Sequence, residues 1–262
     1  MKFIRFFLIS FCLCFFFISH AKEWSPKVSI ITSIYKGDVF IAGFLKDIVR
    51  QTIFKNCELI LINANSPGNE EVIILEYLKK YHNIIYKRLD NDPGYTGVWN
   101  IGIKMARAQY ITNANLDDRL SPYCYEAHSG ELDKNPKIDL IYSDSYITKY
   151  PNETFEVNRA RAVTGKLEFS AERIKSHCLP SCNPMWRKSL HDKYGLFDSN
   201  YKIIGDWEMW IRAVLKGSVF KKIKGFYGLY YQNPAGLSTS KKNDKRRAIE
   251  FKQIIKKYRL DI

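Results

Sequence analysis

The sequence predicts an α/β fold in which helices cover both faces of a mainly parallel sheet. Two observations predict it: short apolar runs rich in β-branched residues recur between Val28 and Asp144, and amphipathic stretches of helical period separate them. Unbroken apolar runs are typical of strands that are buried on both faces. Strands that alternate with helices build right-handed three-layer α/β/α sheets, which bind ligands at the carboxyl ends of the strands.

The pattern begins with two strand–helix units. Val28–Ile34 is a predicted strand, and Asp38 is a candidate N-cap for a helix whose apolar residues repeat from 40 to 53. Glu58–Ala64 is the second predicted strand. The helix predicted over residues 70–82 has acidic residues in its first turn and lysines in its last turn, as the helix dipole favours.

The pattern continues to two adjacent carboxylates. Ile84–Leu89 is a predicted strand, residues 96–108 are a predicted helix, and the strand Tyr110–Asn113 leads to Asp117 and Asp118. The acids therefore follow a buried strand at its carboxyl end, where ligands of such sheets bind.

A further helix and strand complete the alternation. Ser121 is a predicted helix cap and Pro122 the first helical residue, so residues 123–134 are expected to be helical. Ile138–Asp144 is the fifth predicted strand.

Beyond residue 150 the alternation loosens. A helix over residues 207–217 is predicted to end at Gly217, two short strands are predicted around Gly225 within residues 219–231, and residues 241–259 form a basic terminal helix. One apolar face of the first helix is expected to pack inward, and its members are Trp207, Trp210, Ile211, Val214 and Leu215.

The composition favours anionic partners. Lysine and arginine outnumber aspartate and glutamate by 41 to 27, which gives a formal net charge of +14 over 262 residues. Such a balance suits sugar nucleotides, anionic lipid headgroups or acidic glycans. Nucleic acid is not predicted as a partner, because no nucleic-acid-binding motif accompanies the basic residues.

The first 21 residues resemble a secretory signal peptide. Lys2 and Arg5 precede an apolar run from Phe6 to Ile18, and a small-residue pattern ends at Ala21. Retention as a short membrane anchor is the alternative, although the run is shorter than a spanning helix needs. The body is expected to be periplasmic, secreted or in the lumen of the secretory pathway, with the cytoplasmic face of a membrane as the alternative.

The four cysteines outside this leader permit two interpretations. Cys57, Cys124, Cys178 and Cys182 could form two disulfides in an oxidising compartment, or they could be buried free thiols. His177 beside Cys178 is a weak indication of zinc, because no second pair accompanies it.

Several segments carry a family resemblance when they are taken in order along the chain. They are Val28–Ile34, Asn63–Ser66, Trp99–Ile103, Asn115–Asp118, Pro184–Leu190, Tyr194–Asp198 and Asp206–Arg212. Together they resemble the family 2 glycosyltransferases of GT-A fold, a Rossmann-like nucleotide-diphospho-sugar transferase fold. The resemblance implies an inverting glycosyltransferase that moves a sugar from a nucleotide-diphosphate donor to a hydroxyl group of a glycan, lipid or other acceptor.

The resemblance implies a divalent metal site at the two acids. Asp117 is the expected ligand of Mg²⁺ or Mn²⁺, with Asp118 as its neighbour, because hard cations prefer carboxylate oxygens and stabilise the departing diphosphate. The family usually has an acid two residues before the ligand, whereas this chain has Asn115, which brings no charge. A purely structural polar turn is the alternative.

The same resemblance places the donor along the strand ends. Asn63 and Asn65 stand where family members often have aspartates that contact the base and ribose. A loop around Ser238 is expected to close over the diphosphate. The full set of expected donor-binding residues is Thr32, Ser33, Tyr35, Asn63, Asn65, Asn91, Asn100 and Asn115.

The catalytic base implied by the resemblance is Asp206, which would take the proton from the acceptor hydroxyl. An N-cap role for the helix that follows is compatible with it, and Glu208 is an alternative base. Trp207 could belong to the core or to a sugar-stacking wall, while Trp210 is assigned to the core.

These interpretations define three segments: the leader at 1–21, a catalytic domain at 27–240 and the basic helix at 241–262. That helix is either a solvated face or a contact with an anionic membrane surface that carries the acceptor. The alternative function is a non-catalytic exported protein that binds glycans or nucleotide sugars and retains the fold. It is motivated by Asn115 and by the leader.

Overall fold

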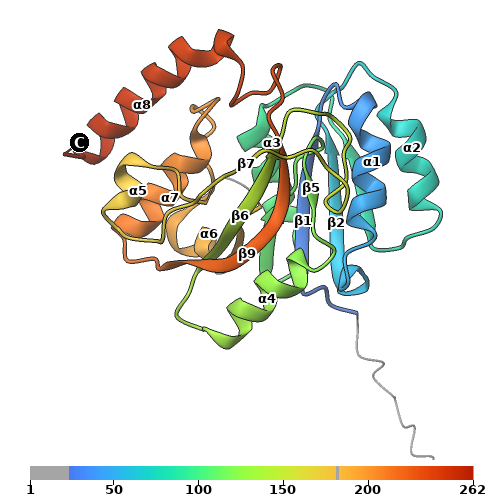
Figure 1. Cartoon of the computed structure of the whole chain (residues 1–262), viewed down its shortest axis with the longest axis horizontal. Helices are drawn as coiled ribbons and strands as arrows, with labels where there is room; N and C mark the ends of the chain where they lie inside the picture. Colours follow the sequence, from blue (N-terminus) through green and yellow to red (C-terminus); the bar gives the residue numbers. More distant parts are fainter. Residues whose placement is uncertain (1–23, 181–182, 262) are drawn as a thin grey trace, which may run out of the picture.

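The computed structural model describes residues 24–180 and 183–261, and it has the predicted three-layer α/β/α architecture (Figure 1). A mainly parallel sheet lies between two layers of helices. The predicted leader, residues 1–21, lies outside the described residues. Along the sheet the strands are, in order, β3 (Ile84–Arg88), β2 (Cys57–Asn63), β1 (Val28–Ile34), β4 (Tyr110–Asn113), β8 (Met185–Arg187), β6 (Leu140–Thr148), β9 (Phe220–Tyr231) and β5 (Arg119–Leu120), while β7 (Ala162–Val163) pairs with β6.

The parallel part of the sheet brings the predicted site residues to one edge. β1 pairs in parallel with β2 on one side, where Ile34 lies opposite Asn63, and with β4 on the other, where Ile31 lies opposite Asn113. β4 and β6 are each antiparallel to the short strand β8, so they point the same way. The carboxyl ends of β1, β2 and β4 therefore form a continuous edge.

Two cores, one on each face of the sheet, explain the unbroken apolar strands. Ile30 faces one core and its neighbour Ile31 faces the other. The first core contains α1 (Asp38–Ile48), α2 (Glu70–Leu78) and α4 (Cys124–Lys134). The second contains α3 (Tyr95–Met105), α5 (Arg173–Ser176), α6 (Ser189–Tyr194) and α7 (Gly205–Leu215). A strand with helices on both sides needs apolar residues at consecutive positions.

The helices end earlier than the sequence predicts. α1 stops at Ile48, because the next residues form tighter turns and Thr52 N–H donates to Pro122 O (2.9 Å) instead. α2 stops at Leu78, so the lysines expected in its last turn lie beyond it. A contact to a distant segment thus accompanies the end of α1.

Two further boundaries differ from the prediction. α4 begins at Cys124, so Ser121 and Pro122 lie in a turn before it and Ser121 is not its N-cap. α3 ends at Met105, after which Ala106 adopts an extended conformation. The prediction of a helix to residue 108 was wrong.

The segment from Phe220 to Tyr231 forms one long strand, β9, not two short ones. Gly225 has φ of +110°, and the pairing of β9 with β6 shifts register next to it. A bulge at a glycine lets one strand bend without ending. β6 extends correspondingly to Thr148, past the predicted end.

The basic terminal helix, α8 (Asp244–Tyr258), packs on α7. Ile254 of α8 joins Trp207 and Ile211 of α7 in a small apolar cluster, and Phe251 stacks on Trp207 with ring centroids 5.1 Å apart. Trp207 therefore belongs to the packed interior. Leu215, predicted on the inward face of α7, is 48% exposed.

The described cysteines favour the free-thiol interpretation. Cys57 and Cys124 are buried thiols without disulfides, and burial raises the pKa of each thiol to about 12. Cys182 lies outside the described residues. Over the described ranges no cluster of three or more His, Cys, Asp or Glu side chains is arranged to hold a metal. The weak indication of zinc at His177 and Cys178 also involves Cys182, so it stays an expectation. In the same ranges no helix has the length and apolar character needed to cross a membrane.

Candidate active site

The loop that carries the two acids is held at both ends by the sheet. Ala114 N–H, directly after β4, donates to Ile31 O (3.0 Å). After the loop, β5 pairs with β9, with Arg119 opposite Leu229. The acids therefore sit on a short connection between two strands, at the carboxyl edge formed by β1, β2 and β4.

Asp118 is turned toward the protein. Its Oδ1 accepts a hydrogen bond from Tyr231 N–H (3.0 Å) and its Oδ2 accepts one from Asn115 Nδ2 (3.0 Å). Burial and the neighbouring charge of Asp117 raise the pKa of Asp118 to about 7, although the two hydrogen bonds oppose the shift. Asn115 therefore supports Asp118 directly.

Asp117 is bound differently. Its Oδ2 accepts a hydrogen bond from Asn233 Nδ2 (3.0 Å), in the loop after β9. No residue in the described part of the chain donates to its Oδ1, so this oxygen can bind a cation. The structure thus brings Asn115, Asp117 and Asp118 together and adds Asn233.

Arg119 holds the acid loop in shape through hydrogen bonds to its backbone carbonyl groups. The side chain is 3% exposed, and its Nη1 donates to the carbonyl oxygens of Leu116 (2.9 Å) and Asp118 (2.6 Å). Its Nη2 donates to Asn152 Oδ1 (3.0 Å). The guanidinium thus joins the acid loop to the segment that follows β6. Neither Asp117 nor Asp118 forms a direct ion pair with Arg119 among the described residues.

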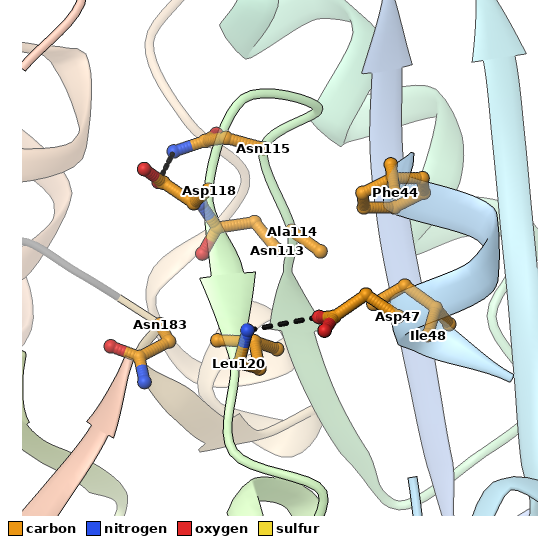
Figure 2. Close-up of a pocket in the computed structure, with 9 residues that line it drawn as sticks. All are labelled: Phe44, Asp47, Ile48, Asn113, Ala114, Asn115, Asp118, Leu120 and Asn183. Carbon is orange, nitrogen blue, oxygen red and sulfur yellow. Dashed lines mark hydrogen bonds between the residues drawn. The ribbon is translucent and has the colours of Figure 1, made fainter. Parts of the chain in front are cut away.

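A small pocket lies behind the acid loop, between it and α1 (Figure 2). Asp47 of α1 accepts a hydrogen bond there from Leu120 N–H (2.9 Å), and burial raises its pKa to about 6. Figure 2 shows Asn115 directed at Asp118 on the other side of the loop. The lining residues are Phe44, Asp47, Ile48, Asn113, Ala114, Asn115, Asp118, Leu120 and Asn183.

The predicted base-contacting residue Asn63 is buried under its own loop. It is 0% exposed, and its Oδ1 accepts a hydrogen bond from Ser66 N–H (2.7 Å). Its Nδ2 has no partner among the residues that the structure describes. Asn65 follows with a left-handed φ of +55° and is exposed. Asn65, not Asn63, therefore presents its side chain to solvent in this conformation.

A buried glutamate joins this loop to the end of β1. Glu70 Oε1 accepts hydrogen bonds from Gly37 N–H (2.6 Å) and Ser66 Oγ (2.7 Å). Lys36 N–H donates to Ser66 Oγ (2.9 Å). A Cβ on Gly37 would lie 2.3 Å from Leu116 Cδ1, so the acid loop also packs here. The loops after β1, β2 and β4 form one connected edge.

The other predicted donor-binding residues divide by exposure. Thr32 is buried within β1, and its Oγ1 lacks a partner among the described residues. Ser33 is half-buried, while Tyr35 and Asn91 are exposed in loops. Asn100 lies inside α3, where its side chain donates to Phe197 O (2.8 Å) and accepts from Phe197 N–H (2.9 Å). Asn100 therefore holds a distant loop and is not at the strand edge.

Asp206 lies in the first turn of α7, at the same edge. The residue before it, Gly205, donates its N–H to Tyr95 Oη (2.7 Å), at the start of α3, the helix that follows β3. Cys178 Sγ lies 3.9 Å from Asp206 Oδ2. Burial raises the pKa of Asp206 above its ordinary value. The expected N-cap role was wrong, since Ile204 is the N-cap and no side chain caps the helix.

Glu208, the alternative base, is committed elsewhere. It is 0% exposed and forms ion pairs with Arg212 (3.0 Å) and with Lys257 (2.9 Å) of α8. Tyr258 also donates to it. Trp210 is 1% exposed, as expected for a core residue. Asp206 is thus the acid of α7 that can act at the strand edge.

The donor set at the acid loop fits a cation that binds together with a diphosphate. Two carboxylates and an amide are too few for a resident site, but Mg²⁺ is commonly held by one or two carboxylates plus substrate phosphates and water. Asp117 has an available oxygen, whereas both oxygens of Asp118 accept hydrogen bonds. The fit therefore favours Asp117 as the direct ligand.

Sequence reasoning missed several residues of this site. Asn233 and Tyr231 bind the acids from more than a hundred positions along the chain, and Arg119, Asp47 and Tyr95 support the surrounding backbone. No local pattern marks such contacts. The only signal was the polar Asn-Pro loop at 233, which predicts a turn and nothing more.

Comparison with known proteins is consistent with this geometry. The family model for glycosyl transferase family 2 matches residues 29–195. The minor teichoic acid biosynthesis protein GgaB of Bacillus subtilis (strain 168) is 28% identical over 229 residues, which are 85% of this chain. The chain spans 25% of the length of that relative.

Two solved structures share the fold. The S. aureus TarS fragment 1–349, in complex with UDP-GlcNAc, is 15% identical with a TM-score of 0.65, over 82% of this chain and 61% of that chain. The mannosyltransferase PcManGT from Pyrobaculum calidifontis, in complex with GDP-Man and Mn²⁺, is 11% identical with a TM-score of 0.66, over 92% of this chain and 66% of that chain.

Proposed function

The chain belongs to glycosyl transferase family 2 and is a transferase. We propose that it moves a sugar from a nucleotide-diphosphate donor to an acceptor hydroxyl, with inversion at the anomeric carbon. The observation that carries the proposal is the placement of two kinds of carboxylate at one sheet edge. Asp117 has an oxygen available to a cation, and Asp206 is a separate, half-buried acid in the first turn of α7.

The acid loop supports a role in binding the diphosphate. Asp117, with Asp118 and Asn115 behind it, would hold Mg²⁺ or Mn²⁺ against the phosphate oxygens. When bound, the cation offsets the negative charge that grows on the departing diphosphate. Asn233 would keep Asp117 oriented, and the loop that follows it, around Ser238, would close over the diphosphate.

Asp206 would take the proton from the attacking hydroxyl. Its raised pKa suits a general base, because a carboxylate of ordinary pKa is a weak proton acceptor. Its place in the first turn of a packed helix gives it a rigid support. Attack from the face opposite the leaving group gives inversion.

The partners follow from charge and from the relatives. TarS and PcManGT were solved with UDP-GlcNAc and GDP-Man, which supports a nucleotide-sugar donor. The name of GgaB refers to teichoic acid biosynthesis, and the net charge of +14 suits an anionic glycan or lipid-linked acceptor. We propose an exported or membrane-associated location, with the basic α8 against an anionic surface.

A binding protein without catalysis is the second candidate, favoured by the uncharged Asn115.

Donor binding and turnover distinguish the two candidates. The full chain is titrated with UDP-GlcNAc, UDP-glucose and GDP-mannose, with Mn²⁺ or with EDTA, and transfer or donor hydrolysis is followed. Asp206→Asn is expected to keep donor affinity and lower turnover roughly 100- to 10,000-fold, since it removes the base. Asp117→Ala is expected to abolish the Mn²⁺-dependent part of donor binding.

The control is Asp90→Asn, an exposed acid, which is expected to change neither quantity. Tight donor binding with no turnover by the wild type would favour the binding-protein candidate. No binding of any of these sugar nucleotides in Mn²⁺ would contradict the proposed donor class.

A further inference from the structure

A buried glutamate of the terminal helix binds the backbone that leads into α7. Glu250 is 2% exposed, although it lies on the strongly basic α8. Its carboxylate accepts hydrogen bonds from the N–H groups of Lys202 (2.8 Å), Ile203 (2.9 Å) and Ile204 (3.1 Å). A buried carboxylate is stable only when its oxygens are satisfied, so this arrangement is specific.

These bonds replace a local cap. Ile204 is the N-cap of α7, and no side chain caps the helix from within. In a capping box, a glutamate or glutamine three residues after the cap binds the N–H of the cap residue. Here that position is Trp207, and Glu250 of another helix binds the same N–H. The start of α7 therefore depends on α8.

A second contact holds the next residue. Gly205 N–H donates to Tyr95 Oη (2.7 Å), and a Cβ at Gly205 would lie 2.7 Å from Thr96 Cγ2. Four consecutive N–H groups, from residues 202 to 205, are thus bound by side chains of α8 and α3. Asp206 is the next residue in the chain.

We propose that Glu250 is a positioning residue, which sets the place of Asp206 by fixing the backbone that enters α7. The proposal rests on the proposed role of Asp206 as the base. A general base must lie within hydrogen-bond reach of the hydroxyl, and a shift of about 1 Å can cost about 100-fold in rate.

The rest of α8 supports the same arrangement. Lys257 Nζ forms ion pairs with Glu208 Oε1 (2.9 Å) and Asp198 Oδ2 (3.2 Å), which lie on either side of residues 202–206 in the sequence. Phe251 stacks on Trp207. Helix α8 therefore contacts the first turn of α7 next to Asp206, and Glu250 supplies the hydrogen bonds to its entry.

The test compares Glu250→Ala and Glu250→Gln with a matched control on the same helix. Arg246→Gln removes the ion pair of Glu250 with Arg246 (2.9 Å) and leaves the three backbone bonds. Turnover of UDP-GlcNAc with Mn²⁺, by hydrolysis, and donor Kd are measured on the full chain. Glu250→Ala is expected to lower kcat about 10- to 100-fold at unchanged donor Kd.

The amide oxygen of Glu250→Gln can still accept hydrogen bonds. We therefore expect its loss of log kcat to be at most half of that of Glu250→Ala. Arg246→Gln is expected to stay within about twofold of the wild type. In an Asp206→Asn background, Glu250→Ala should cause no further loss, because the group it positions is gone. Thermal unfolding confirms that each variant is folded at the assay temperature.

Either of two kinetic results would overturn the proposal. One is a kcat of Glu250→Ala within twofold of the wild type. The other is an equal loss of kcat when Glu250→Ala is introduced into the wild type and into Asp206→Asn. Amide hydrogen exchange adds a readout that does not need turnover. Faster exchange confined to residues 202–206 in Glu250→Ala supports the role, and unchanged exchange there contradicts it. Failure of the base assignment appears separately, as full turnover by Asp206→Asn.

Discussion

At the scale of single residues, the site depends on carboxylates whose surroundings differ. Asp118 accepts two hydrogen bonds, and burial together with the charge of Asp117 raises its pKa to about 7. Burial raises the pKa of Asp206 above its ordinary value. Asp117 Oδ2 accepts a hydrogen bond from Asn233 Nδ2, and no described residue donates to its Oδ1. These acids thus have different surroundings, and the different chemical roles that we propose for them rest on those surroundings.

The buried Asp47 gives a prediction about stability and pH. Its pKa is about 6 in the folded protein and near 3.9 when unfolded, so the folded state binds the proton more tightly. The stability that this provides is complete below pH 4 and is lost as pH rises through 6, by up to roughly 3 kcal/mol. Asp47→Asn, which can still accept from Leu120 N–H, lacks this dependence.

Urea unfolding at pH 4, 5, 6 and 7 in EDTA measures the effect. The wild type is expected to lose more unfolding free energy over this range than Asp47→Asn, while the exposed Asp90→Asn should follow the wild type. Parallel curves for the wild type and Asp47→Asn would show that Asp47 titrates at its ordinary pKa.

At the scale of elements, packing between α3 and the sheet is close. A Cβ added to Gly102 of α3 would lie 2.4 Å from Ile31 Cγ2 of β1. At Gly130 of α4 an added Cβ meets no atom within 4 Å in the described part of the molecule. The two glycines lie in helices of the same length, 11 residues, on opposite faces of the sheet.

This contrast predicts opposite effects of one substitution. Gly102→Ala is expected to destabilise the protein by about 1–3 kcal/mol through overpacking. Gly130→Ala is expected to stabilise it by about 0.5–1 kcal/mol, because alanine has the higher helix propensity. Thermal or urea unfolding measures both. Equal stability changes for the two variants would contradict the packing argument.

At the scale of the whole molecule, the basic helix α8 lies at the end of the molecule opposite α1 and α2 (Figure 1). Lys245, Ile249, Lys252 and Lys256 recur at helical spacing and are all exposed. The opposite side of the helix carries Glu250 and Ile254 into the interior. One face of α8 thus packs against α7, while the other face is exposed.

The proposed membrane contact predicts charge-specific binding to vesicles. The full chain is expected to bind vesicles of equal phosphatidylglycerol and phosphatidylcholine, but not phosphatidylcholine alone, with loss at high salt. Lys245→Glu/Lys252→Glu should weaken binding roughly tenfold or more, at about 1 kcal/mol for each basic residue. Cosedimentation measures it.

A matched control changes the same charge elsewhere. Lys79→Glu/Lys80→Glu, just after α2, also lowers the net charge by four, and both lysines are exposed. This variant is expected to bind like the wild type. If both variants weaken binding equally, net charge and not the face of α8 is responsible.

The architecture and the outline of the site could be predicted from the amino-acid sequence. Five apolar runs became strands within a residue or two, except that β6 continued to Thr148, because a strand buried on both faces needs apolar residues throughout. The place of the acids at the end of β4 followed from the same alternation, whereas Asp206 at the start of α7 followed from the family resemblance. Local patterns contain this information, since helix and strand periods are local.

Only the tertiary structure decided which groups hold these acids. The hydrogen bonds of Asp117 to Asn233, of Asp118 to Tyr231 and of Glu250 to the entry of α7 join segments 46 to 116 residues apart. The end of α1 and the continuous strand β9 depend on such contacts too. The physical reason is that burial and hydrogen-bond satisfaction depend on all neighbours in space, which no local spacing records.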